Sequence, residues 1–303
     1  MSSSLARRVL LTTALLGTPL LALAACAEFL GALEDATDPD SAEGKLVRGA
    51  NKLRKSAQDL DPSEEHYIGR TVAAQIVAMP QYKLSQDQAL TAYVTRVGLG
   101  VAMSNDRVRH TFAGYHFAVL DTDEVNALAC PGGTIFVSKG LLAKATSEDE
   151  VAAILAHEIA HVTLRHGLEQ IKKANLASAF QYLGSGALQA AGSNSADLQE
   201  LAKVFDDSVK DVVGALITSG YSREAEAQAD QLGRELLGGT GYDPQALTRV
   251  LAKMGEVGGE GGMFATHPSP ADRLQTLTQP MPYAADAAAL AARATRFAAV
   301  VKR

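Results

Sequence analysis

Two histidines and a glutamate have a spacing that suits the binding of a metal ion. They lie in VAAILAHEIAHVTLRHG (151–167), which has the apolar periodicity of an amphipathic helix. Because an α-helix turns once in about 3.6 residues, His157 and His161 project from one face, one turn apart. Two imidazoles so placed can bind one Zn²⁺, and Glu158 between them can reach a water molecule there. The alternative is an exposed helix with two solvated histidines.

A catalytic zinc site needs a third protein ligand, and a second predicted helix offers one. The segment YSREAEAQADQLGREL (221–236) is rich in helix-forming residues. Glu226 and Asp230 share one face, so Glu226 can bind the metal while Asp230 accepts a hydrogen bond from a metal-binding histidine. Arg223 and Glu224 are expected in solvent. The alternative for Glu226 is a glutamate exposed on a helix surface.

A third histidine stands in a stiff loop near the end of the chain. Pro268 restricts His267 to extended backbone, and Pro270 stiffens the entry into a final short helix. His267 could donate a hydrogen bond to the developing oxyanion, or it could occupy the open position on the metal and hold an enzyme latent. Arg273 would fix this loop or bind the backbone of a substrate. The alternative is a surface histidine that only packs the last helix.

The helix that carries the first two histidines has recognisable ends. Ser147 is the predicted N-cap, and Glu150 is expected to reach back to it as a capping box. A glycine stop and a cationic last turn are predicted at Arg165-His166-Gly167, with His166 acting on the helix dipole and not as a ligand. The stripe predicted to face the core consists of Val151, Ile154, Leu155, Ile159 and Val162.

Three sequence blocks resemble one family of enzymes. HEIAH, YSREAEAQAD and THPSPADRL resemble the signature blocks of the HtpX-like and CAAX prenyl protease-like zinc endopeptidases, metallopeptidase family forty-eight. The resemblance extends from about residue 62 to 280 and implies the gluzincin class, with one Zn²⁺ per subunit. It implies that Glu226 is the third zinc ligand. It also implies that Asp230 contacts a metal-binding histidine on the side away from the metal. In the family, this aspartate is sometimes assigned as a proton donor.

The sequence departs from the pattern of this family at two positions. Cys130 stands where an aliphatic residue is usual, and Gln228 replaces a commoner acidic residue inside the second block. Neither is a predicted ligand, so the implied chemistry is unaffected. Cys130 lies in an apolar, strand-like stretch and is expected to behave as a small buried hydrophobe.

The N-terminus resembles a bacterial lipoprotein signal. Arg7 and Arg8 precede a short apolar run that ends in Leu23-Ala24-Ala25-Cys26, which is similar to a lipobox. Residues 1–25 are therefore the expected signal peptide, and Cys26 the expected lipidation site. Ala27 follows in place of Asp, which by analogy directs such a lipoprotein to the outer membrane, facing the periplasm. The arginine pair leaves the export route open.

The composition fits one domain behind this anchor and gives no indication of nucleic-acid binding. Lys and Arg number 28 against 34 for Asp and Glu, so the net charge of −6 gives no electrostatic case for nucleic acid. Lipidation of Cys26 would leave Cys130 as the only free thiol, so no disulfide is expected within the chain. Residues 26–60 are predicted to be a tether, 61–280 the peptidase domain and 281–303 a C-terminal helix.

The expected fold is α+β, a mostly helical zincin-type domain with a small sheet just before the HExxH helix. The edge strand of that sheet would pair with an extended peptide. Residues 170–218 are predicted to form either a mobile cover over the cleft or plain packing helices, and Gly255–Gly262 a flexible link. Helices are expected at 63–82, 86–103 and 284–300, strands at 115–121, 125–129 and 134–138, and a turn at 131–133.

These patterns predict a zinc-dependent endopeptidase anchored in the bacterial cell envelope. Glu158 would take a proton from water and pass it to the leaving amine. The expected partners are unfolded or extended polypeptides, including misassembled envelope proteins, and the membrane through the N-terminal lipid. The alternative is a chaperone-like binder of envelope proteins with latent or minor proteolysis. Neither the natural substrate nor the oligomeric state can be read from the sequence.

Overall fold

Helices surround a small three-stranded sheet in the part of the chain that the computed structural model describes, which is residues 61–170, 213–214, 217, 220–257, 267 and 269–301. The predicted signal, the tether and Cys26 lie outside these residues, and so does nearly all of the segment 170–218. The helices are α4 (Pro62–Ala78), α5 (Gln88–Met103), α6 (Lys139–Leu142), α7 (Glu148–Thr163), α10 (Arg223–Gly239), α11 (Gln245–Val257), α13 (Pro270–Thr276) and α14 (Ala287–Val300), and the strands are β1 (His116–Leu120), β2 (Ala127–Ala129) and β3 (Thr134–Ser138). The predicted α+β fold is confirmed.

Strand β3 lies at the centre of the sheet. It pairs in parallel with β1 and antiparallel with β2, so β2 forms an edge among the described strands. A single 3₁₀ turn, η1 (Pro131–Gly133), joins β2 to β3 where the turn was predicted. Gly132 has φ 74°, and a β-carbon there would lie 2.8 Å from the Cα of His66 on α4. Only glycine satisfies both conditions, so α4 can approach this turn closely.

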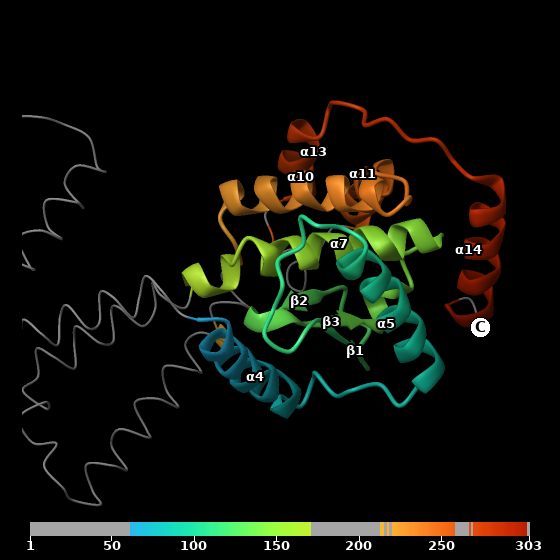
Figure 1. Ribbon diagram of the computed structural model, residues 1–303. Coiled ribbons are helices and arrows are strands. Elements are labelled where there is room, and N and C mark those ends of the chain that lie inside the picture. Colours follow the sequence, from blue (N-terminus) through green and yellow to red (C-terminus); the bar gives the residue numbers. More distant parts are fainter. Residues whose placement is uncertain are drawn as a thin grey trace, which may run out of the picture. The chain divides into compact units, whose positions relative to one another are not determined.

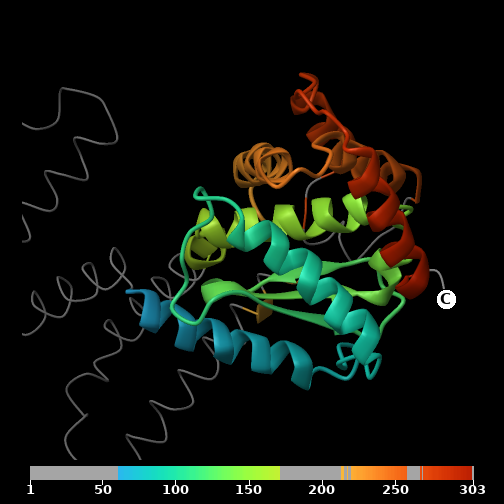
Figure 2. The ribbon, with the colours of Figure 1, turned by 45° about the vertical axis from the view of Figure 1, so that its right-hand side comes forward.

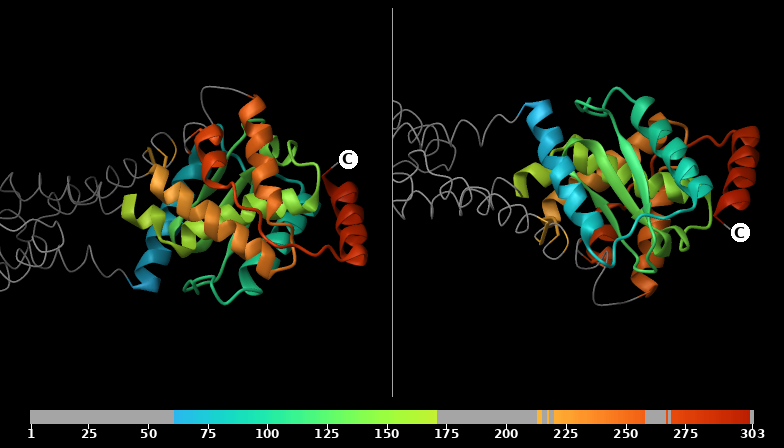
Figure 3. Two further views of the ribbon diagram at one scale, coloured as in Figure 1. Left: turned by 90° about the horizontal axis from the view of Figure 1, so that it is seen from above. Right: turned by 90° about the horizontal axis from the view of Figure 1, so that it is seen from below.

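The helices form layers on both sides of the sheet. Helix α4 lies on one face and α7 on the other, and α10 packs on the outer side of α7 (Figures 1 and 2). Seen from above, α10 and α11 lie over α7; seen from below, α4 crosses the strands (Figure 3). Two segments far apart in the sequence, α7 and α10, are therefore neighbours along much of their length.

Helix α7 is central, not amphipathic. The predicted apolar stripe is buried, but so is every other residue from Glu148 to Val162. The interpretation of an amphipathic helix is therefore wrong. The polar face that would have met water is covered by α10, and the two histidines lie on this covered face, 2 % exposed for His157 and 1 % for His161.

The N-terminus of α7 is capped as predicted on one side only. Ser147 Oγ accepts a hydrogen bond from the Glu150 backbone N–H at 3.3 Å. The reciprocal half of the capping box is wrong, because the Glu150 carboxylate accepts from the Thr146 N–H at 2.7 Å and pairs with Lys253 of α11 at 2.7 Å. The carboxylate therefore serves Thr146 and α11 in place of the Ser147 N–H.

Two further acids at the start of α7 hold the C-terminal helix. Glu148 pairs with Arg296 at 2.6 Å and Asp149 pairs with Arg293 at 3.0 Å, both arginines belonging to α14. Glu148 and Asp149 are buried. The acidic first turn therefore does more than interact with the helix dipole, since it fastens α14 to the helix that carries the two histidines.

The C-terminus of α7 also differs from the prediction. The helix ends at Thr163, and the residue with a left-handed backbone is Arg165, with φ 61°, not Gly167. The Nε atom of Arg165 lies 3.6 Å from Glu65 Oε2, a buried carboxylate of α4 that also pairs with Arg109. After this turn His166 is buried, with 7 % of its surface exposed.

Other predicted boundaries shift as well: α4 ends at Ala78 and not at residue 82, and β2 begins at Ala127 and not at residue 125. Helix α11 continues to Val257, so the predicted Gly-rich link does not begin at Gly255, and residues 258–262 lie outside the described part. Helix α14 begins at Ala287, where Asp286 caps it through a hydrogen bond from the Ala289 N–H at 2.8 Å. No helix among the described residues is both long and apolar enough to cross a membrane.

Candidate metal centre

The two histidines of α7 and Glu226 of α10 face one another. The Nε2 atoms of His157 and His161 are 3.1 Å apart. Glu226 Oε1 lies 3.3 Å from His161 Nε2, and its Oε2 lies 3.5 Å from His157 Nε2. Glu226 is completely buried, so the alternative of an exposed glutamate is wrong.

These separations fit a tetrahedral zinc ion. Ligand bonds of about 2.0–2.1 Å place two ligands of a tetrahedral ion about 3.3 Å apart, and the three separations, which involve one oxygen of Glu226 for each histidine, lie within about 0.2 Å of that value. A donor set of imidazole nitrogens with a carboxylate oxygen is also the kind that zinc enzymes use. The residues present therefore fit the metal that the family resemblance implied.

His267 joins this cluster from the loop before α13. Its ring is 4 % exposed, so the alternative of a surface histidine is wrong. His267 Nδ1 lies 2.7 Å from Glu226 Oε1. One ligand atom from each of His157, His161, Glu226 and His267 falls within 4.8 Å of the others, so the four side chains could hold a metal ion together.

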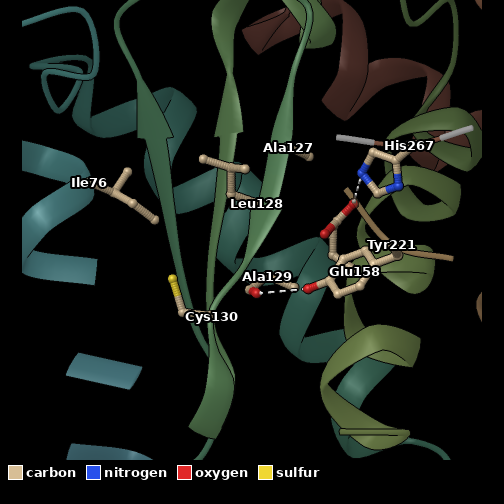
Figure 4. Close-up of a pocket in the computed structure, with 8 residues that line it drawn as sticks. All are labelled: Ile76, Ala127, Leu128, Ala129, Cys130, Glu158, Tyr221 and His267. Atoms are coloured by element: carbon tan, nitrogen blue, oxygen red, sulfur yellow. Dashed lines mark hydrogen bonds and ion pairs between the residues drawn. The ribbon is translucent and has the colours of Figure 1, made fainter. Parts of the chain in front are cut away.

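Glu158 lies beside the cluster and has no hydrogen bond. Its side chain is 1 % exposed, and both carboxylate oxygens are buried without a hydrogen-bond partner. The imidazole of His267 lies nearby, with Nε2 3.9 Å from Glu158 Oε1 (Figure 4). Burial raises the pKa of Glu158 above its usual value, against the opposing effect of His267 and His157. A free carboxylate next to a metal site is placed to accept a proton.

Asp230 and Arg273 support His157 from behind. Asp230 Oδ1 lies 3.0 Å from His157 Nδ1. Arg273 donates two hydrogen bonds to the same carboxylate, from Nε at 2.9 Å and from Nη2 at 2.5 Å, and its Nη1 lies 3.2 Å from Glu226 Oε2. Its guanidinium is thus used inside the site, which leaves no support for the expectation that Arg273 binds the backbone of a substrate.

The two histidines of α7 differ in their electrostatic surroundings. Burial acts to lower the pKa of His157, but the hydrogen bonds with Asp230 and Glu226 raise it to about 9. Burial lowers the pKa of His161 well below its usual value, although its contact with Glu226 acts to raise it. Burial also acts to raise the pKa of Glu226, yet the surrounding histidines hold it below its usual value. Glu226 is therefore ionised and able to bind a cation.

Two neighbours of His161, and a glutamine that contacts one of them, were missed by the sequence analysis. The Tyr221 ring stacks on His161, with centroids 4.0 Å apart and planes at 20°. His166 Nδ1 lies 2.9 Å from His161 Nδ1, and His166 Nε2 lies 3.2 Å from Gln228 Oε1. His166 was predicted to act on the helix dipole, and the structure gives it a direct contact with His161. The left-handed turn at Arg165 directly precedes His166, and no spacing rule indicates the contact. Arg223 and Glu224 are exposed, as expected.

A small cavity separates Glu158 from the edge strand of the sheet. Glu158, His267 and Tyr221 lie on one side of β2, and Ile76 of α4 lies on the other (Figure 4). The Tyr221 hydroxyl donates to the Ala129 carbonyl of β2 at 3.5 Å. Cys130 also lines the cavity; burial, with Glu158 nearby, raises the pKa of its thiol to about 12, so it is the inert, buried residue that was expected.

A comparison with protein families decides the identity of this site. A family model described as peptidase family M48 matches residues 88–281, a stretch that contains His157, His161, Glu226 and His267. The chain belongs to peptidase family M48. The resemblance noted in the sequence is confirmed, and with it the class of the enzyme, a zinc metallopeptidase.

Curated relatives in this family carry protease names. The chain is 28% identical to the beta-barrel assembly-enhancing protease of Yersinia pestis over 234 residues, 72% of this chain and 46% of that protein. It is 35% identical to the mitochondrial metalloendopeptidase OMA1 of Arabidopsis thaliana over 170 residues, 55% of this chain and 32% of that one. The metalloprotease LoiP of Escherichia coli K12 is 29% identical over 168 residues, 55% of this chain and 62% of LoiP. The chain thus spans less than half the length of the first two.

Proposed function

We propose that the chain is a zinc-dependent endopeptidase in which His157, His161 and Glu226 hold the ion and Glu158 carries the proton. The observation that best supports this is the spacing of the two histidine nitrogens and the two Glu226 carboxylate oxygens, 3.1–3.5 Å, next to a buried carboxylate that has no hydrogen bond. A surface role for these residues would not require all four side chains to be buried together.

In the proposed reaction Glu158 moves the proton. A zinc ion held by His157, His161 and Glu226 would supply polarisation of the scissile carbonyl and a lower pKa for water. Glu158 takes the proton of the attacking water and gives it to the leaving amine, which avoids expulsion of an amide anion. Because neither oxygen of Glu158 is bound by another group, its lone pairs face the cavity without competition. Its raised pKa makes it a better proton acceptor.

The roles proposed for Asp230 and Arg273 are supporting ones. Asp230 accepts the hydrogen bond of His157 Nδ1, which fixes the tautomer that presents Nε2 to the metal. Arg273 holds Asp230 in this orientation through two hydrogen bonds. No contact favours a proton-donor role for Asp230, whose pKa is kept low by Arg273 although burial acts to raise it.

His267 is proposed to hold the enzyme latent. A catalytic zinc site keeps one position open, yet a fourth ligand atom from His267 lies among the other three. Ligation by His267 would fill the position at which substrate must bind. This arrangement supports the latent role over stabilisation of the oxyanion, because a hydrogen-bond donor to the oxyanion need not reach the ligand cluster. The His267 side chain must therefore leave the ligand cluster before cleavage.

The substrate is proposed to be an extended polypeptide that pairs with β2. Strand β2 has a partner, β3, on one side only among the described residues, and its other side faces the cavity beside Glu158. An extended chain could form backbone hydrogen bonds there. The Tyr221 hydroxyl bound to the Ala129 carbonyl occupies one of these sites and would have to be displaced.

The proposed location is the bacterial cell envelope, with unfolded or misassembled envelope proteins as substrates. Two observations support this: the resemblance of residues 23–26 to a lipobox, and the name of a relative, beta-barrel assembly-enhancing protease. Lipidation of Cys26 would attach the protein to the outer membrane on its periplasmic side. Replacing Cys26 with serine should move the protein from the membrane fraction to the soluble envelope fraction, and an unchanged distribution would reject the anchor.

The decisive experiment is the substitution Glu158→Gln in the purified protein. The amide keeps the shape of the side chain but cannot accept the proton, so zinc content should stay at the wild-type level while cleavage of unfolded casein is lost. Glu224→Gln, the same change at an exposed position of α10, is the matched control and should cleave normally. A Glu158→Gln protein that cleaves casein at the wild-type rate would reject the assignment.

A chaperone-like binder is the second candidate, and the position of His267 favours it. If all four side chains bind the metal, no position on the metal is open for catalysis. The protein could then still bind polypeptide at β2 without cleaving it. The two functions separate in cells with an envelope-assembly defect. Rescue by the Glu158→Gln variant would show that binding suffices, and rescue by the wild type alone would show that cleavage is needed.

A further inference from the structure

The outer nitrogen of His161 contacts a second histidine, where that of His157 contacts a carboxylate. His161 Nδ1 lies 2.9 Å from His166 Nδ1, a hydrogen-bond distance between two ring nitrogens. Of two imidazole nitrogens so close, one must carry a proton and the other a lone pair. The contact therefore defines which tautomer each ring adopts.

The position of the metal ligands decides the direction of this hydrogen bond. His161 Nε2 faces His157 Nε2 and Glu226 Oε1, so this nitrogen must supply the lone pair for the metal. His161 Nδ1 then carries the proton and donates it to His166 Nδ1. His166 in turn carries its own proton on Nε2, which lies 3.2 Å from the acceptor Gln228 Oε1. All three residues are satisfied by one arrangement of protons.

We propose that His166 is a positioning residue of the metal centre, which orients His161 and fixes its tautomer through a neutral hydrogen-bond chain that ends at Gln228. The proposal rests on the proposed ligation of zinc by His161. The hydrogen-bond chain starts at the completely buried side chain of His161 and passes through His166, which is 7 % exposed. It ends at Gln228 on the exposed side of α10.

The local fold supports this role over simple packing. Tyr221 stacks on one face of His161 and so fixes the plane of the ring, but stacking does not distinguish Nδ1 from Nε2. A hydrogen bond at Nδ1 is the contact that makes this distinction. The left-handed backbone of Arg165, an uncommon conformation for a residue other than glycine, delivers His166 to this nitrogen.

The hydrogen-bond chain from His161 to Gln228 carries no net charge, and this has a chemical consequence for the metal site. Glu158, Glu226 and Asp230 are already buried there, and the Arg273 guanidinium contacts the latter two. A carboxylate behind His161 would add a further buried negative charge without a partner. An imidazole backed by an amide accepts the Nδ1 proton without adding charge. Support of a metal-binding histidine from behind is typically worth about 10–100-fold in metal affinity.

Substitutions at His166 test the proposal through zinc affinity. His166→Phe keeps an aromatic ring but cannot accept a hydrogen bond, so the dissociation constant for zinc should rise by about 10–100-fold. His166→Gln can accept from His161 through its oxygen and donate to Gln228 through its nitrogen, and it should restore most of the affinity. Gln231→Met, on the exposed side of α10, is the control and should bind zinc as the wild type does.

The effect of Gln228→Met should be smaller than that of His166→Phe, because water can replace an exposed amide as the acceptor. The double variant of both changes should bind zinc no more weakly than His166→Phe alone, since Gln228 acts only through His166.

Long-range ¹H–¹⁵N spectra of the zinc-loaded wild-type protein test the tautomers directly and do not depend on the folding of any variant. The proton of His161 should reside on Nδ1 and that of His166 on Nε2. A proton on Nδ1 of His166 would overturn the proposal, and so would wild-type zinc affinity in a folded His166→Phe protein. His161→Ala separates the two levels of inference: wild-type zinc affinity there would reject ligation by His161 itself, whereas its loss, with His166→Phe unaffected, would reject only the role of His166.

Discussion

Arg273 holds the Asp230 carboxylate through two hydrogen bonds, and both side chains are buried. Arg273→Met removes the cation but leaves two buried carboxylates, Asp230 and Glu226, so the free energy of unfolding should fall by about 3–5 kcal/mol. Urea denaturation of the zinc-loaded protein measures it. Arg223→Met, which breaks an exposed ion pair with Asp272, is the control and should change little. A similar small change in both variants would contradict this account.

His267→Ala should raise the basal rate of peptide cleavage. If His267 holds the metal site closed and the open form is about 0.1–10% populated, its removal can raise turnover by about 10–1,000-fold. Steady-state cleavage of an unfolded protein, with zinc content measured in parallel, gives the result. A fall of about 10²–10³ would instead assign His267 to stabilisation of the oxyanion. Unchanged kinetics and zinc affinity would reject both roles.

Removal of zinc should abolish cleavage and lower the thermal stability. A ligand at a free concentration about 1,000 times its dissociation constant stabilises the folded state by about 4 kcal/mol, and this contribution disappears with the metal. Melting temperatures with and without a chelator measure the effect. In His157→Ala the chelator should produce a much smaller shift. An equal shift in both proteins would mean that the metal acts elsewhere.

Arg293→Leu should destabilise the protein without weakening zinc binding. The change leaves Asp149 buried without its guanidinium partner at 3.0 Å and also removes the hydrogen bond to the Gly241 carbonyl at 2.7 Å. The expected cost is about 3–5 kcal/mol. Arg293→Lys should recover part of it. Because α14 contributes no side chain to the metal cluster, zinc affinity should stay at the wild-type level, and a parallel loss of affinity would refute this separation.

The sequence by itself determined the residues that are linked by one element. His157 and His161, or Glu226 and Asp230, must share a face because the period of the helix is fixed by its backbone hydrogen bonds. The strands and the turn at Gly132 also follow local rules, since alternation and glycine geometry act over a few residues. The family resemblance linked the two predicted helices, because it implied that Glu226 binds the same metal as His157 and His161.

The tertiary structure alone decided which distant groups meet. The burial of α7 on every side depends on α10 covering its polar face, which no periodicity within α7 can indicate. The contact of His166 with His161 depends on the turn at Arg165, which Glu65 of α4 helps to hold. Likewise, the acids that begin α7 find their arginines on α14, nearly 150 residues later along the chain. Such pairs are selected by the packing of whole elements, because burial makes an unpaired charge too costly to leave.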